Sequence, residues 1–188
     1  MLEQRTPEDA GDYEALSYTW GDLTEKRSIK CCNKPFLVTE NLFPALRHLR
    51  YADRGRFLRI DAICINQESI PERNQQVGIM GHIYKSARKV TIWLGEDEQG
   101  KDAVDAVDRM LQELSAIDRE EWINRYSVLN YDDSLGEPQI WRSLEWLFGL
   151  PWFRRVWILQ EAALASSATF MLRQQTLPGR IWNLQLRQ

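Results

Sequence analysis

The 188-residue sequence has little of what metal and disulfide chemistry require. It contains only two histidines, His48 and His82, and three cysteines, two of them adjacent at positions 31 and 32. An odd number of cysteines leaves at least one thiol unpaired, so we expect no disulfide framework and a reducing compartment such as the cytosol. Because the sequence has neither a Cys-x-x-Cys motif nor a close pair of histidines, we expect no metal site.

Other missing features exclude further classes of function. No apolar run approaches the roughly 20 residues that span a bilayer, and the polar, acidic N-terminal segment does not resemble a secretory signal. The net charge of −3 lacks the basic surplus typical of a nucleic-acid-binding protein. The glycine-rich loops of P-loop and Rossmann sites are absent, as is the G-x-S-x-G elbow. What remains is an ordinary globular composition, 44% hydrophobic and 27% charged, in a chain long enough for one domain.

The order of the predicted elements indicates an α/β fold. Strands are predicted at 13–18, 56–65, 89–94 and 167–172, and a hairpin at 28–38. Helices are predicted after Thr39 or Asn41, from Ser69 to about Ala87, and at 101–116, 141–148 and 156–165, with a polar loop at 117–138. Ser69 followed by Glu72 is a capping box, and the helix that follows carries one apolar stripe, formed by Val77, Met80, Ile83, Tyr84 and Ala87. Alternating strands and helices are typical of a parallel sheet with helical crossovers.

Glu161 is the first candidate for chemistry. It lies in the almost wholly apolar segment 156–165, and at helical spacing it shares a face with Trp157. If that face packs inward, the carboxylate leaves water and needs a partner, or its pKa rises. An isolated carboxylate in a cleft suits a reaction in which positive charge develops, such as cleavage at a sugar carbon. The alternative is a solvated position, or an ion pair with Arg154 or Arg155.

The turn after the first predicted strand is the second candidate. In open α/β sheets, ligands bind beyond the carboxyl ends of the strands. This turn combines a hydroxyl, two aromatic rings that can stack on a flat group, a flexible glycine and a carboxylate, from Ser17, Tyr18, Trp20, Gly21 and Asp22. The alternative is a tight turn whose tryptophan fills the core.

The segment at the carboxyl end of the second central strand is the third candidate. Asp61 interrupts an apolar run and must be hydrogen-bonded if it is buried. Cys64 can act as a nucleophile only if a base lowers its pKa, and a buried free cysteine is more often a small hydrophobic residue. Asn66 either lines the site or caps backbone groups at the strand end.

Three long motifs stand in a fixed order along the chain. They read YEALSYTWGD (13–22), RIDAICINQ followed by ERNQQVGIMGHIYKSARKVTIWLGE (59–96), and LPWFRRVWILQEAALA (150–165). Together they resemble the heterokaryon incompatibility (HET) domain of filamentous fungi. One departure from the family pattern is Arg59, where the family usually has tryptophan before Ile-Asp.

The resemblance implies a fold and a site. HET domains are regarded as distant relatives of TIR domains, which implies an α/β, TIR-like three-layer sandwich with a central, mainly parallel sheet. The implied single domain covers residues 1–188, with a core at about 13–172 and a helical insertion at about 96–149 before the catalytic helix. The segment VWILQEAALA is similar to the TIR helix that carries the glutamate of NAD-cleaving members, which puts Glu161 at the catalytic position.

The resemblance also implies two alternative functions in fungal self/non-self recognition and programmed cell death. In the first, the domain is an NAD nucleosidase that cleaves the nicotinamide–ribose bond. Glu161 is then catalytic, the other candidate residues and Trp157 bind the substrate, and NAD is the substrate while no cofactor is needed. In the second, the domain is a non-enzymatic death-signalling module. Both imply self-assembly into a homo-oligomer on activation, and an upstream receptor or incompatible partner protein.

Overall fold

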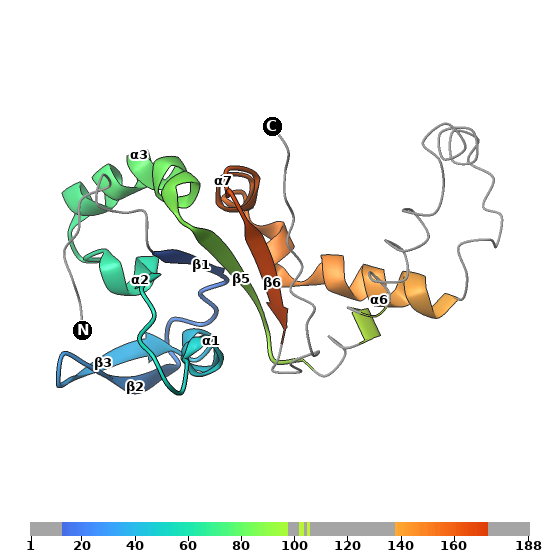
Figure 1. Ribbon diagram of the computed structural model, residues 1–188, viewed down its shortest axis with the longest axis horizontal. Helices are drawn as coiled ribbons and strands as arrows, with labels where there is room; N and C mark the ends of the chain where they lie inside the picture. The colour runs from blue at the N-terminus through green and yellow to red at the C-terminus, as the bar shows by residue number, and fades with distance from the viewer. Residues whose placement is uncertain (1–12, 98–101, 104, 106–137, 173–188) are drawn as a thin grey trace.

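A parallel sheet of four strands forms the centre of the computed structural model, which describes residues 13–97, 102, 103, 105 and 138–172 (Figure 1). In their order across the sheet, the strands are β4 (Leu58–Arg59), β1 (Glu14–Tyr18), β5 (Lys89–Gly95) and β6 (Ala168–Leu172). Every neighbouring pair is parallel, so the carboxyl ends of all four strands lie along one edge. The predicted α/β class with a mainly parallel central sheet is confirmed.

Apolar clusters cover both faces of this sheet. The elements that flank it are α3 (Ile70–Ser86) and α7 (Ile158–Ala163) on one face, and on the other α1 (Leu42–Leu49) and the hairpin of β2 (Lys26–Cys31) and β3 (Lys34–Thr39) (Figure 1). Successive side chains of a strand point to opposite faces. In β1, Ala15 therefore packs on the α3 side and Leu16 on the α1 side. The strand delivers alternate residues to two separate cores.

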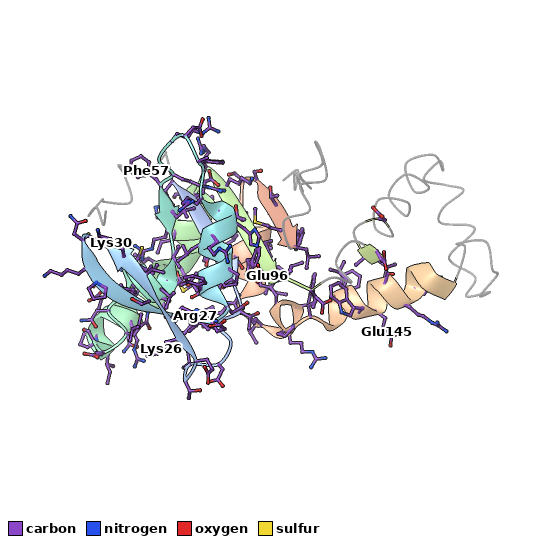
Figure 2. All side chains as sticks on the ribbon, turned by 90° about the horizontal axis from the view of Figure 1, so that it is seen from below. Lys26, Arg27, Lys30, Phe57, Glu96 and Glu145 are labelled. Atoms are coloured by element: carbon purple, nitrogen blue, oxygen red, sulfur yellow. The ribbon has the colours of Figure 1, made fainter. Side chains whose placement is uncertain are left out.

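The hairpin and the helix after it form as local sequence signals require. Cys32 and Asn33 both have positive φ, 50° and 62°, which is the backbone of a two-residue turn that matches the strand twist. The basic side chains Lys26, Arg27 and Lys30 project outward from the hairpin (Figure 2). Of the two predicted caps of α1, Thr39 makes the contact, because its Oγ1 accepts from the backbone N–H of Leu42 at 3.3 Å.

The strand predicted at 56–65 is much shorter in the structure. Only β4 pairs with β1, and the next residues form the one-turn helix α2 (Asp61–Cys64). The backbone N–H groups of Ile63 and Cys64 donate to the carbonyl of Ile60, at 3.0 and 2.8 Å. Although β1 continues to Tyr18, the chain turns into α2 after two paired residues, and its backbone satisfies its hydrogen bonds locally instead. Asp61 consequently begins a helical turn rather than interrupting a strand.

The long helix α3 begins where its capping signal predicts. The Ser69 Oγ accepts from the backbone N–H of Glu72 at 3.4 Å. The Glu72 carboxylate accepts from the backbone N–H of Asn66, at 2.9 Å, instead of closing the box on Ser69. Four of the five residues predicted for the inward stripe are buried, namely Met80, Ile83, Tyr84 and Ala87, whereas Val77 is exposed.

The C-terminal part of the described chain brings α7 against α3. It contains α6 (Pro138–Gly149), the 3-10 helix η2 (Pro151–Arg154), α7 and β6. The helix predicted at 156–165 is shorter in the structure, where α7 covers Ile158–Ala163 and still includes Glu161. At the crossing, a Cβ added to Gly81 would lie 3.2 Å from Leu164, so a residue without a side chain allows the close approach. Most of the predicted helix at 101–116, and the predicted loop up to 137, lie outside the described residues.

The described residues also include all three cysteines, and each is a free thiol. No helix among these residues is both long enough and apolar enough to cross a bilayer.

Candidate active site

Glu161 is the centre of a buried hydrogen-bond network at the carboxyl end of β1. Its side chain has 0% exposure. The Ser17 hydroxyl donates to Oε2 at 2.5 Å, and the Trp152 indole N–H donates to the Ser17 oxygen at 2.7 Å. The Arg155 guanidinium contacts both carboxylate oxygens, with Nη1 2.9 Å from Oε2 and Nη2 2.7 Å from Oε1. Every contact to Glu161 therefore comes from a donor, which suits a carboxylate.

Three elements and the residue that follows one of them position this network. Ser17 is the fourth residue of β1, where strand alternation turns it toward the face covered by α3 and α7. Trp152 lies in η2, Arg155 directly follows η2, and Glu161 lies on α7. Ser17 and Glu161 are separated by 144 positions in the chain, so tertiary packing alone brings them together.

The ion pair with Arg155 answers the question that the sequence left open for Glu161. The carboxylate is removed from water but it is not isolated, because a two-point guanidinium contact compensates its charge. Arg154, the other predicted partner, is exposed. Both oxygens of Glu161 accept hydrogen bonds and neither is exposed, so a ligand can reach them only if Arg155 or Ser17 moves.

Asp61 differs from Glu161 in having no such partner. Its side chain is partly buried, and no residue in the described part of the chain donates a hydrogen bond to its carboxyl or forms an ion pair with it. Burial, and next the charge of Glu161, raise the pKa of Asp61 to about 6, while the charges of Arg59 and Arg155 act in the opposite direction. A hydrogen bond was expected of Asp61 only if it were buried, and its side chain is only partly buried. The strand end bears one compensated carboxylate and one uncompensated carboxyl.

Two tyrosines complete the surroundings of Asp61. Tyr18 is only 2% exposed, and its hydroxyl has no hydrogen-bond partner among the residues that the structure describes. Burial, and next the negative charge of Asp61, raise its pKa above the usual range. Tyr84 on α3 has a raised pKa for the same two reasons, with Glu161 contributing as well. Both hydroxyls stay protonated at neutral pH and can donate hydrogen bonds.

Trp152 and Tyr84 were not predicted as site residues. Tyr84 was assigned to the buried stripe of its helix, which is where its ring lies. Trp152 is one of eight tryptophans, and nothing in the sequence distinguishes the one whose N–H orients Ser17. Arg155 was predicted, since it was one of the two arginines expected to pair with Glu161.

The rest of the predicted turn serves the fold more than the network. Trp20 packs against the α1-side core, as the alternative interpretation expected. Gly21 has φ of +73°, a conformation that favours glycine. The Asp22 carboxylate accepts from the backbone N–H and the hydroxyl of Thr24, at 2.8 and 2.7 Å, and these hydrogen bonds lower its pKa. Among the described residues, no hydrogen bond or ion pair joins Trp20, Gly21 or Asp22 to Ser17 or Glu161.

The other predicted residues have local contacts too. The Cys64 Sγ accepts from the backbone N–H of Ile60 at 3.5 Å. The Asn66 Oδ1 accepts from the backbone N–H of Glu68 at 3.1 Å, which is the capping role foreseen as its alternative. Trp157 does not share the buried face of Glu161. The helix α7 begins at Ile158, after Trp157, and Trp157 is 43% exposed.

The described residues do not form a side-chain group that holds metal ions. Among the described residues, no group of three histidine, cysteine, aspartate or glutamate side chains is arranged to hold a metal ion. The described side chains at the strand end offer two carboxyl groups, three hydroxyls, an indole N–H and a guanidinium.

Comparison with known proteins agrees with the motif order. The family model described as "Heterokaryon incompatibility protein (HET)" matches residues 13–161. The chain is 29% identical over 199 residues to "Heterokaryon incompatibility protein 6, OR allele" of Neurospora crassa, an alignment that covers 84% of this chain and 28% of that protein. The chain thus spans under a third of the length of this relative. No solved structure matches the chain. Because the family match covers most of the sequence, including Ser17, Asp61 and Glu161, the chain belongs to the heterokaryon incompatibility (HET) family.

Proposed function

We propose that this HET domain is an NAD nucleosidase that cleaves the bond between nicotinamide and ribose, and that this activity drives cell death in fungal incompatibility. The observation that supports the proposal is the meeting of Glu161, Ser17 and the charge of Asp61 at the carboxyl end of β1. This is the edge at which parallel α/β sheets bind their ligands.

The reaction needs little more than such a site offers. Nicotinamide leaves as a neutral molecule, so the main barrier is the positive charge that develops on the ribose carbon. Carboxylates fixed in a low-dielectric environment stabilise that charge more strongly than water does. Glu161 would hold the ribose hydroxyls and face the developing charge, while Ser17, fixed by Trp152, would orient them.

The occupied oxygens of Glu161 imply that the described state is closed. Arg155 must release at least one oxygen before a ribose hydroxyl can bind there. Arg155 lies in extended backbone between two helices and is followed by Val156, which is 81% exposed, and by the exposed Trp157. We propose that self-assembly through this exposed segment displaces Arg155, which links activity to a homo-oligomer.

The test is nicotinamide release from NAD by purified protein at low and high concentration. We expect release to rise with assembly, and Glu161→Gln to lower it by about 10³-fold, the effect of removing a principal electrostatic group. The control is Glu145→Gln, since Glu145 is exposed on α6 (Figure 2), and it should keep full activity. Equal release from wild type and Glu161→Gln would remove Glu161 from this role.

A second candidate function is a non-enzymatic assembly module. It is favoured by the complete set of partners around Glu161, which a purely structural ion pair would also have. In that case Val156→Asp should abolish assembly, and wild-type protein forced to assemble should release no nicotinamide. Release above the Glu161→Gln background would reject this candidate.

A further inference from the structure

The two carboxyl groups at the strand end are prepared for different tasks. Glu161 has no exposed surface, and three donors occupy its oxygens. Asp61 is partly exposed and carries no hydrogen bond from any described residue. A group that must accept a proton during a reaction needs a free lone pair and access to water. Of the two, Asp61 alone meets both conditions.

Charged and titratable groups surround Asp61 from every neighbouring element. They are Glu161 on α7, Arg155 before α7, Arg59 on β4, Tyr18 on β1 and Tyr84 on α3. The balance of these groups with burial raises the pKa of Asp61 to about 6. A base is most effective when its pKa lies near the working pH, so Asp61 would be ionised and still basic at neutral pH.

Asp61 follows β4, whose Arg59 is in register with Ala15, so it lies near the carboxyl end of β1, where buried polar atoms lack partners. Among the described residues, four buried side-chain atoms lack a hydrogen-bond partner. Two of them, the Tyr18 hydroxyl and the Arg59 Nε, belong to residues that interact electrostatically with Asp61. Buried polar atoms are normally satisfied. A water molecule held beside Asp61 would accept from Tyr18 and donate to the carboxylate.

We propose, resting on the nucleosidase function above, that Asp61 is the general base that takes the proton from the attacking water. The carbon–nitrogen bond breaks and its electron pair stays on the nicotinamide nitrogen, which thereby loses its positive charge. The water oxygen forms the new bond to the ribose carbon. Its proton passes to the Asp61 carboxylate and then to solvent. Glu161 stabilises the charge on the sugar, and Tyr18 positions the water.

Asp61→Asn is the direct test, because asparagine keeps the size of the side chain but cannot accept the proton. We expect kcat to fall by about 10²–10⁴-fold, the usual contribution of a general base, with KM changed by less than about threefold. The wild-type rate should fall below pH 6 as Asp61 becomes protonated, and this acidic limb should disappear in Asp61→Asn. Asp61→Glu should keep part of the activity.

Azide gives a readout that a structural role would not change. As an anion it attacks the ribose carbon without losing a proton, so it should restore turnover in Asp61→Asn and form azidoribosyl product, while accelerating the wild type much less. Asp53→Asn, an exposed position outside the site, is the matched control and should behave as wild type.

The outcomes separate this inference from the function on which it rests. If Asp61→Asn keeps the wild-type rate and pH profile, or is not rescued by azide, the role of Asp61 as base is overturned while the nucleosidase stands. If wild-type protein releases no nicotinamide in any assembly state, both are overturned together.

Discussion

The two ends of β1 each bury a glutamate against arginine, yet among the described residues only the carboxyl end leaves polar groups without hydrogen-bond partners. At the amino end, Glu14 is 2% exposed and accepts from Arg56 at 2.5 and 3.2 Å and from Arg88 at 2.9 Å. Arg56 also donates to the carbonyl of Leu49 at 2.7 Å. Burial works against the charged form of Glu14, but these arginines outweigh it and lower its pKa.

The carboxyl end has an equivalent pair, between Glu161 and Arg155, but Asp61 and the Tyr18 hydroxyl remain beside it without partners in the described chain. A buried ion pair is therefore not what distinguishes a functional site in this fold. The distinction lies in the neighbouring groups whose hydrogen bonds the protein does not supply. Substitutions at the two ends should expose this difference.

The largest effect on stability is expected from Arg155→Ala. It leaves the fully buried Glu161 with Ser17 as its remaining donor, and an uncompensated buried charge typically costs about 3–5 kcal/mol. Arg56→Ala should cost less, because Arg88 still contacts Glu14. Urea unfolding measures both. Arg154→Ala, an exposed neighbour, is the control, and a loss equal to that of Arg155→Ala would contradict the role of the ion pair.

Asp61→Asn should act in the opposite direction and stabilise the fold at neutral pH. The folded state raises the pKa of Asp61 from 3.8 to about 6, so it retains a proton that the unfolded chain releases. Stability from this group is complete below pH 4 and is lost as the pH rises through 6. Removing the carboxyl should thus raise the unfolding free energy at pH 7.5 by up to about 3 kcal/mol, with little change at pH 4.

Glu14→Gln provides the contrasting pH dependence at the other end. Because the pKa of Glu14 is lowered in the fold, its stabilisation is present at neutral pH and is lost as the pH falls through the folded value. The variant should be less stable than wild type at pH 7 and approach it in acid. If the unfolding free energies of Asp61→Asn and Glu14→Gln changed with pH in the same way, the proposed difference between the two ends of β1 would be contradicted.

Trp152→Phe should have a smaller effect. The ring still packs against Phe153 and Phe170, but the donor to Ser17 is lost, which costs about 1 kcal/mol. The Ser17 hydroxyl would no longer be held toward Glu161, so nicotinamide release should fall more than stability does. Unfolding and turnover measured on the same preparation would reveal that split. Equal losses in both would mean that the indole N–H is purely structural.

Arg88→Ala should have the smallest effect. The Arg88 side chain is 58% exposed, and exposed ion pairs contribute about 1 kcal/mol or less. Thermal unfolding at low and high salt would measure the change. A loss as large as that of Arg56→Ala would show that the two arginines share the charge of Glu14 equally.

The sequence predicted those parts of the fold that rest on local signals. The cap at Ser69, the inward stripe of α3 and the strand β5 all follow from residue type and spacing. The strand predicted at 56–65 was too long, because the chain leaves β1 after Arg59 and forms α2, and a short apolar run does not by itself distinguish a buried strand from a helix. The length of α7 depended in the same way on tertiary contacts.

The candidate site was predictable only in its charged residues. One acid in an apolar segment identified Glu161, and one acid in an apolar run identified Asp61. Trp152 and Tyr84 contribute an indole N–H and a hydroxyl from rings that also fill the core, and their partners are distant in the chain. Tertiary packing decides whether such a polar atom faces the site or bonds to another part of the core.

The separation of Ser17 from Glu161 has a consequence for how the protein can be divided. The stretch 13–97 supplies the serine, the aspartate and both tyrosines, whereas 138–172 supplies the tryptophan, the arginine and the glutamate. Each stretch therefore carries part of the site, and neither can complete it alone. Expressed as two polypeptides, they would form a split reporter whose site exists only where the two pieces meet.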